Sequence, residues 1–268
     1  MKTFSGQEID PRECVQYVID VLKIDELDAG RVDIRFADDI KRSVKMVHPG
    51  VGDSFAIRRR EYNREEPCEP FSRDALKEVS SLVLGEFRPS AAKKGMKIGT
   101  IRLYPNAIAE FCTANGLDPD TVLLATLARE AFQACHYSVF KSCGVSMRWN
   151  SGSTKKNRDI VKESLADAFE YTFLINQGGD WLSHAEAHKY MDFLENTWRS
   201  LDIEDWPSSG ALGIGGVGLT KVAVPPSIMD RLLHGFIHDW KSAADIIKTG
   251  YYLADDETCS VLGLDLEA

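Results

Sequence analysis

The sequence lacks a long apolar run, an excess of basic residues and any internal repeat. No stretch approaches the roughly 20 consecutive apolar residues that a membrane-spanning helix needs. The formal net charge is −9, whereas nucleic-acid-binding surfaces are usually basic. We therefore expect neither a membrane nor a nucleic acid as a partner.

Paired cysteine motifs are missing as well. A dispersed set without any C-x-x-C pair suits reduced thiols better than a disulfide framework. A secretory signal peptide has an apolar segment followed by a cleavage site of small residues. The first residues of this sequence contain neither feature. These features predict a cytoplasmic protein. The six cysteines are Cys14, Cys68, Cys112, Cys135, Cys143 and Cys259.

Length and composition are those of an ordinary globular protein. The 268 residues are 44% hydrophobic and 27% charged, so the chain can bury a sizeable core. Strand-like segments precede Tyr104 and helical segments follow it, without the βαβ alternation of parallel sheets. We predict an α+β fold with a small N-terminal mixed sheet packed on a mainly helical body. One domain, 1–268, would comprise a sheet-containing part, 1–104, and a helical part, 105–268.

Apolar periodicity places the individual elements. Residues 31–36 and 97–104 alternate apolar and polar side chains as strands do, and residues 55–57 are a shorter candidate. The mixed-charge segment 58–69 is predicted to be a loop. Helices are predicted over residues 11–22, 72–84, 105–115, 121–137, 158–177, 181–201 and 226–249.

The segment Thr121–Tyr137, TVLLATLAREAFQACHY, is the helix around which the chain is organised. Apolar side chains cover most of its circumference, which is typical of a buried helix. Arg129, Gln133 and His136 share the remaining side, with Glu130 at its edge. Polar groups on a buried helix need partners, so this stripe predicts either a polar core network or the lining of a cleft.

Part of this segment, LAREAFQACHY, resembles the active-site helix of zinc metallopeptidases, whose motif is H-E-x-x-H. Glu130 matches the general base of the motif, whereas Arg129 and Gln133 replace its two histidines. Downstream, KESLAD resembles the second helix of the gluzincin group, in which Glu163 matches the third zinc ligand. The resemblance covers about residues 98–171.

The resemblance implies a zincin-like fold in which Glu130 is a vestigial general base. In such enzymes, a strand before the active-site helix forms the edge of the cleft and pairs with an extended peptide substrate. Residues 97–104 occupy the corresponding place in this sequence.

The two replaced histidines argue against a zinc site. Arg129 has no acceptor lone pair, and Gln133 offers only an amide oxygen. We predict that the guanidinium pairs with Glu130 or Glu163, takes the place of the metal and holds two acidic helices together. On this interpretation the protein carries no zinc cofactor. The acidic face of the predicted helix 158–177 comprises Asp159, Glu163, Asp167 and Glu170.

The sequence is consistent with three functional interpretations. The first is a metallopeptidase-like protein without catalysis, whose cleft binds a peptide or protein; its candidate binding residues are Arg129, Gln133, His136, Glu163 and Asp167. The second is an active hydrolase in which Glu130 is the base and His136, Glu163 and Asp167 form a rearranged metal site. The third is an interaction or scaffold protein with a closed polar core. An open pocket beside Arg129 favours the first two, and a closed, paired Arg129 favours the third.

Two histidine pairs and one glycine-rich segment also stand out. His184 and His188 lie one turn apart on a predicted helix, but no third ligand is evident, so we expect histidines at the edge of the core. His234 and His238 have the same spacing on a predicted exposed face. Residues 213–218 match G-x-G-x-x-G without a preceding strand and are predicted to be a flexible loop.

Overall fold

The computed structural model describes residues 4–6, 8–38, 41–47, 59–63, 77–90, 97–142, 165–176, 181–199, 241 and 244. Its fold is α+β, as the sequence predicts, with a small mixed sheet and a mainly helical remainder. The predicted strand 55–57, the loop 213–218 and most of the predicted helix 226–249 lie outside the described residues.

Three of the helices begin with a proline in the first turn. These are α1 (Pro11–Val21), α2 (Pro105–Asn115) and α3 (Pro119–Ser142). Proline suits this position because its fixed φ is helical and it has no N–H that needs a partner.

Side chains cap two of these helix starts. Asp10 caps α1 by accepting a hydrogen bond from the Arg12 N–H at 2.9 Å. Asp118 caps α3 by accepting from the Thr121 N–H at 2.8 Å. Further along the chain, residues 165–176 are helical and α5 spans His184–Arg199. Along the described stretches, no helix is long and apolar enough to cross a membrane.

The first sheet has three strands in the order β1-β6-β5. β1 (Val32–Phe36) runs parallel to β6 (Gly99–Leu103), and β5 (Gly85–Pro89) runs antiparallel to it. The predicted strands 31–36 and 97–104 are therefore confirmed. The expectation that the second of them forms a cleft edge is wrong, because β6 is the central strand and is hydrogen-bonded on both sides.

A second sheet has the order β3-β2-β4 and is antiparallel. Its strands are β2 (Lys41–Val47), β3 (Arg59–Asn63) and β4 (Lys77–Leu82). Two predictions are wrong here, since β3 lies within the expected loop 58–69 and β4 lies within the expected helix 72–84. The local patterns were overridden by pairing with β2, a contact between segments distant in sequence.

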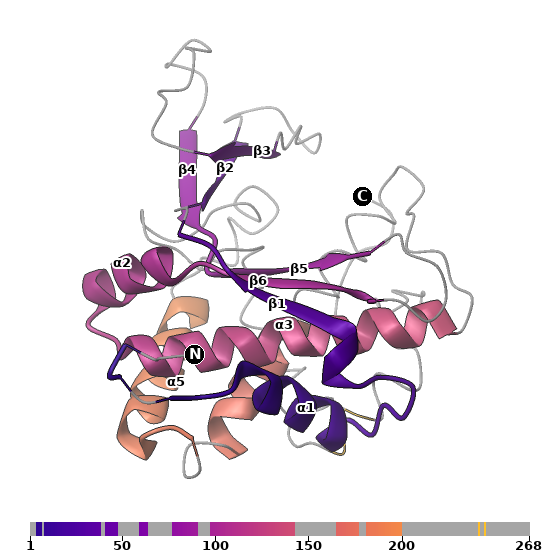
Figure 1. Ribbon diagram of the computed structural model, residues 1–268. Coiled ribbons are helices and arrows are strands. Elements are labelled where there is room, and N and C mark those ends of the chain that lie inside the picture. The colour runs from indigo at the N-terminus through magenta and orange to yellow at the C-terminus, as the bar shows by residue number, and fades with distance from the viewer. Residues whose placement is uncertain are drawn as a thin grey trace.

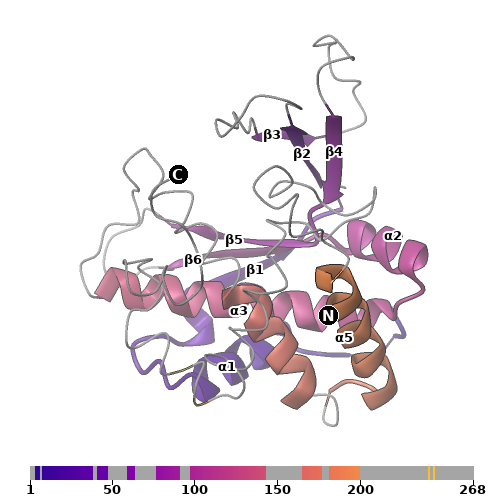
Figure 2. The ribbon, with the colours of Figure 1, turned by 180° about the vertical axis from the view of Figure 1, so that it is seen from behind.

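Helix α3 is the centre of the molecule (Figure 1). It packs against β5 and β6 of the first sheet and against α1, α2 and α5. Viewed from behind, the 165–176 helix and α5 lie on the side of α3 away from this sheet (Figure 2). The whole stretch from Thr121 to His136 is buried, as the sequence predicts for a helix enclosed by its neighbours.

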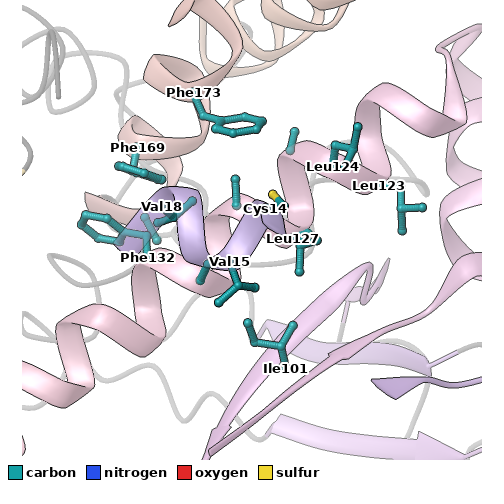
Figure 3. Packing of buried hydrophobic residues seen from close by; sticks show 14 of the residues in the cluster. Cys14, Val15, Val18, Ile101, Leu123, Leu124, Leu127, Phe132, Phe169 and Phe173 are labelled. Carbon is teal, nitrogen blue, oxygen red and sulfur yellow. The ribbon is translucent and has the colours of Figure 1, made fainter. Parts of the chain in front are cut away.

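The apolar core joins α3 to the sheet, to α1 and to the 165–176 helix. Figure 3 shows Val15 of α1 near Leu127 of α3 and Val18 beside Phe132, with Ile101 of β6 on the side of Val15. The rings of Phe132 and Phe169 stack with their centroids 4.6 Å apart, which ties α3 to the 165–176 helix. Burial of these apolar surfaces supplies the main force that fixes the helices around α3.

The contact between the sheet and α3 is unusually close at Gly85. A Cβ atom at this position would lie 2.6 Å from Thr126 Cγ2 and 3.3 Å from Glu130 Cγ. Glycine is therefore required for β5 to approach the helix at the turn that carries Glu130. The sheet in this way covers one side of the polar residues of α3.

Candidate functional site

Arg129 of α3 lies among three carboxylates. Its Nη1 donates to Glu130 Oε1 at 2.8 Å, and its Nε and Nη2 both lie 2.7 Å from Asp167 Oδ1. Its Nε is also 3.7 Å from Glu170 Oε2. We call Arg129, Glu130, Asp167 and Glu170 the Arg129 cluster. The cluster joins α3 to the 165–176 helix by charge-assisted hydrogen bonds.

The cluster lies in the interior of the protein. The exposed fraction of the side chain is 7% for Arg129, 1% for Glu130, 17% for Asp167 and 7% for Glu170. Buried charges are costly unless they are paired and hydrogen-bonded. The guanidinium meets this requirement, since its nitrogen atoms lie within 2.7–3.7 Å of carboxylate oxygens.

Helix α5 contributes one further side chain next to the cluster, Tyr190. Its hydroxyl donates to Glu170 Oε1 at 3.0 Å, and both side chains are buried. Burial raises the pKa of Tyr190 well above its usual value, and the neighbouring Glu170 adds to this shift. Tyr190 therefore remains a protonated donor over the whole range in which the carboxylates titrate.

Glu170 has an unusual proton affinity for a carboxyl group. Burial raises its pKa to about 7, although the nearby Arg129 cation opposes the shift. Asp167 and Glu130 add to the increase because they place further negative charge beside it. Glu170 is thus a buried acid that changes charge near neutral pH.

The predicted site residues are only partly brought together. Arg129, Glu130 and Asp167 are in contact, whereas Glu163 lies outside the described residues. Gln133 and His136 are buried further along α3, and the His136 ring lies 5.9 Å from that of Phe132.

Sequence reasoning missed two members of this site, Glu170 and Tyr190. Glu170 had a signal, because it shares the acidic face of its helix with Asp167. Tyr190 had none, since it stands among the apolar residues of α5, beside the buried Ala187 and Met191. Only its contact with Glu170 of the 165–176 helix reveals that Tyr190 belongs to the site.

The residues of the cluster do not fit a zinc ion. Zinc takes imidazole, thiolate or carboxylate ligands, but here the three carboxylates surround a permanent cation, Arg129. In the part of the chain described, no three His, Cys, Asp or Glu side chains form a group suited to a metal. A dication at this place would have to displace the guanidinium or lie next to it, against strong repulsion.

The chemistry of the cluster is that of a structural clamp. A general base has to reach a proton on substrate or water, but Glu130 Oε1 is engaged by Arg129 and the residue is 1% exposed. Arg129 cannot exchange a proton at ordinary pH. The group best suited to proton exchange is Glu170, which faces Tyr190 and Arg129 inside the protein.

Helix α5 carries a second polar grouping, formed by His184 and His188. Both side chains are exposed, and their Nε2 atoms are 3.0 Å apart. The expectation that these histidines lie at the edge of the core is therefore wrong. They lie on the solvent face of the helix because its opposite face, with Ala187, Tyr190 and Met191, is the buried one.

Comparison with known proteins gives no match: no protein-family model fits the sequence, and no curated protein or solved structure is significantly similar to it. The resemblance to zinc metallopeptidases consequently rests on the motif residues and on their spacing alone.

Proposed function

We propose that this chain is a zincin-like protein without peptidase activity, which acts by binding another protein or a peptide. In this proposal the metal of an active zincin is replaced by the guanidinium of Arg129. The observation that carries it is the set of contacts of Arg129 with Glu130, Asp167 and Glu170, at 2.7–3.7 Å. A metal joins two helices through its ligands, and the buried cation does the same here through carboxylates.

Burial of the cluster favours the alternative of an interaction or scaffold protein with a closed polar core over an open peptide-binding cleft. A paired, largely buried Arg129 is the arrangement expected if the former cleft is filled by the protein's own side chains. Binding would then use surfaces away from the cluster. The active-hydrolase alternative needs Glu130 to reach water, and its contact with Arg129 disfavours that role.

The first test is the metal content and peptidase activity of the purified full-length protein. We expect no zinc held at the cluster and no cleavage of unstructured peptides. Elemental analysis should be made on wild type and on the H184Q/H188Q variant, so that metal on the surface histidines is not counted. One equivalent of zinc that survives in H184Q/H188Q but is lost when His136 or Asp167, two ligands of the rearranged site, is replaced would overturn the proposal.

The second test asks whether the helices retain zincin geometry. In R129H/Q133H, two imidazoles would stand one turn apart on α3, facing the helix that carries Asp167. We expect this variant to bind zinc, because two imidazoles and one carboxylate form a complete catalytic-type ligand set.

Adding E163A or D167A to R129H/Q133H identifies the third ligand. The resemblance implies that E163A abolishes zinc binding, whereas the observed contact of Asp167 with Arg129 makes D167A the matched comparison. A folded R129H/Q133H that takes up no zinc in calorimetry would show that the two helices lack the zincin arrangement.

A further inference from the structure

His184 and His188 bring two imidazole rings into contact one helical turn apart on α5. The two rings are nearly perpendicular, at 87°, and their centroids are 4.3 Å apart. Their Nε2 atoms approach to 3.0 Å on the exposed side of α5. The same ring nitrogen of both side chains therefore lies at this contact, on the exposed face of the helix.

This separation matches two adjacent ligands of one metal ion. Bonds of about 2.05 Å from a metal to two nitrogens 3.0 Å apart enclose an angle of about 94°. Such an angle is that of neighbouring ligands in square-planar or octahedral coordination. A tetrahedral zinc ion would need the nitrogens about 3.3 Å apart at the same bond length.

The metal that fits best follows from geometry and ligand type. Tetragonal sites with nitrogen and oxygen ligands are typical of Cu²⁺ and Ni²⁺, and affinity for such ligands rises toward Cu²⁺ in the divalent series. Within the described ranges, no third His, Cys, Asp or Glu completes a group with the two histidines. Water molecules would therefore occupy the remaining positions.

We propose that His184 and His188 form a surface binding site for a divalent late transition metal, with a preference for Cu²⁺ or Ni²⁺ over Zn²⁺. Each histidine supplies Nε2, and the regular helix α5 places the two residues one turn apart on its exposed face. Two ligands on one helix lower the entropic cost of binding the ion. This proposal is independent of the role of the Arg129 cluster.

The test measures binding of Cu²⁺ alone by calorimetry, with glycine as a competing ligand, in an H48Q/H234Q/H238Q background. This background removes His48, His234 and His238, and leaves His184 and His188 with His136, which is buried. We expect one equivalent of Cu²⁺, at least tenfold weaker binding in H184Q or H188Q, and weaker binding of Zn²⁺ than of Ni²⁺.

The matched control is H188Q/K189H, which keeps the number of histidines but turns the second by about 100° around the helix. It should bind as weakly as H188Q, because the two nitrogens no longer meet. Binding of Cu²⁺ by H188Q or by H188Q/K189H as tightly as by the background would overturn the proposal. So would an electron paramagnetic resonance spectrum of the background with fewer than two coordinated nitrogens.

If the background variant does not fold, binding of Cu²⁺ is measured in the otherwise unaltered chain. There, H184Q/H188Q is expected to lower the number of bound Cu²⁺ ions by one. An unchanged stoichiometry contradicts the site.

Discussion

The Arg129 cluster and the His184–His188 pair place polar side chains in opposite surroundings. The cluster buries a cation among three carboxylates between α3 and the 165–176 helix. The histidine pair projects from α5 into solvent, and its two rings contact each other. Both groupings lie on helices that the sequence predicts, and both have spacings that suggest a metal site.

The difference shows that burial, more than spacing, decides what a polar pair does. In the interior, removal of one partner leaves the others desolvated, so the cluster is tied to folding. On the surface, water replaces any missing partner, so the histidines are available to a ligand at little cost in stability. The variants below separate these two regimes, beginning with the largest expected effect.

Arg129→Ala is expected to reduce the free energy of unfolding most. It would leave Glu130, Asp167 and Glu170 close together in the interior without their cation. Breaking a buried ion pair in this way costs about 3–5 kcal/mol. Urea unfolding followed by circular dichroism measures the loss.

Arg88→Ala is the matched control for Arg129→Ala. Arg88 also contacts a glutamate, Glu86, at 2.7 Å, but its side chain is 46% exposed. Its loss should change the free energy of unfolding by no more than about 1 kcal/mol. Equal effects of the two alanine variants would show that the Arg129 cluster is not a buried clamp.

Glu170 should make the stability depend on pH. Its pKa is raised from 4.5 to about 7 in the folded protein, mainly by burial, so between these values the folded state holds a proton that the unfolded state has released. Stability therefore falls as the pH rises through this range. The loss amounts to roughly 3 kcal/mol at most, at 1.36 kcal/mol for each pKa unit.

Glu170→Gln should flatten this dependence, because the amide does not titrate. Arg129, Glu130, Asp167 and Tyr190 remain in place around it, so their own contributions are retained. Glu186→Gln, on the outer part of α5, serves as the control and should keep the slope of wild type. A slope in Glu170→Gln equal to that of wild type would assign the pH dependence to another group.

Sequence patterns predicted the helical core well because its signals are local. Pro105 and Pro119 mark helix starts, and the apolar circumference of α3 marks its burial. The pairing of Arg129 with Glu130 was also accessible, since the two residues are neighbours. The acidic face of the 165–176 helix indicated the other side of the cluster, although Asp167 and Glu170 are the observed partners there.

The failures concern contacts between distant segments. The mixed charges of β3 predict a loop, and the apolar residues of β4, spaced at three and four, predict a helix, but both segments are strands. Both strands pair with β2, which is distant from them in sequence. Local strand propensity cannot predict which segments pair or in what register. Tyr190 was missed for the same reason, because its partner Glu170 lies on another helix.

Tyr190→Phe removes a single hydrogen bond, the one that Tyr190 donates to the buried Glu170. A hydrogen bond to a charged group contributes about 1.5–3 kcal/mol, and this one joins Tyr190 to Glu170 at 3.0 Å. We expect a loss of this size above pH 7, where Glu170 is ionised, and a smaller one at pH 5, where it is protonated. Urea unfolding at both pH values measures the difference.

Tyr137→Phe provides the control, because its hydroxyl makes a long 3.5 Å contact with the Ser90 carbonyl oxygen. Its substitution should have a smaller effect, independent of pH. A loss in Tyr190→Phe that is equally independent of pH would mean that the hydroxyl does not respond to the charge on Glu170.

The smallest change in the free energy of unfolding is expected for His188→Gln, at the exposed histidine pair, in the absence of metal. His188 and His184 are both exposed, so water can replace each as the partner of the other, and the free energy of unfolding should change by no more than about 0.5 kcal/mol.

Adding Ni²⁺ should make the stabilities of wild type and His188→Gln differ, because an ion that binds only the folded state stabilises it more the more tightly it binds. Wild type should then melt at a higher temperature than His188→Gln, by a margin that grows with Ni²⁺ concentration. Equal melting temperatures at every Ni²⁺ concentration would mean that the pair does not bind Ni²⁺ in the folded protein. An exposed histidine pair would then not be sufficient for a metal site.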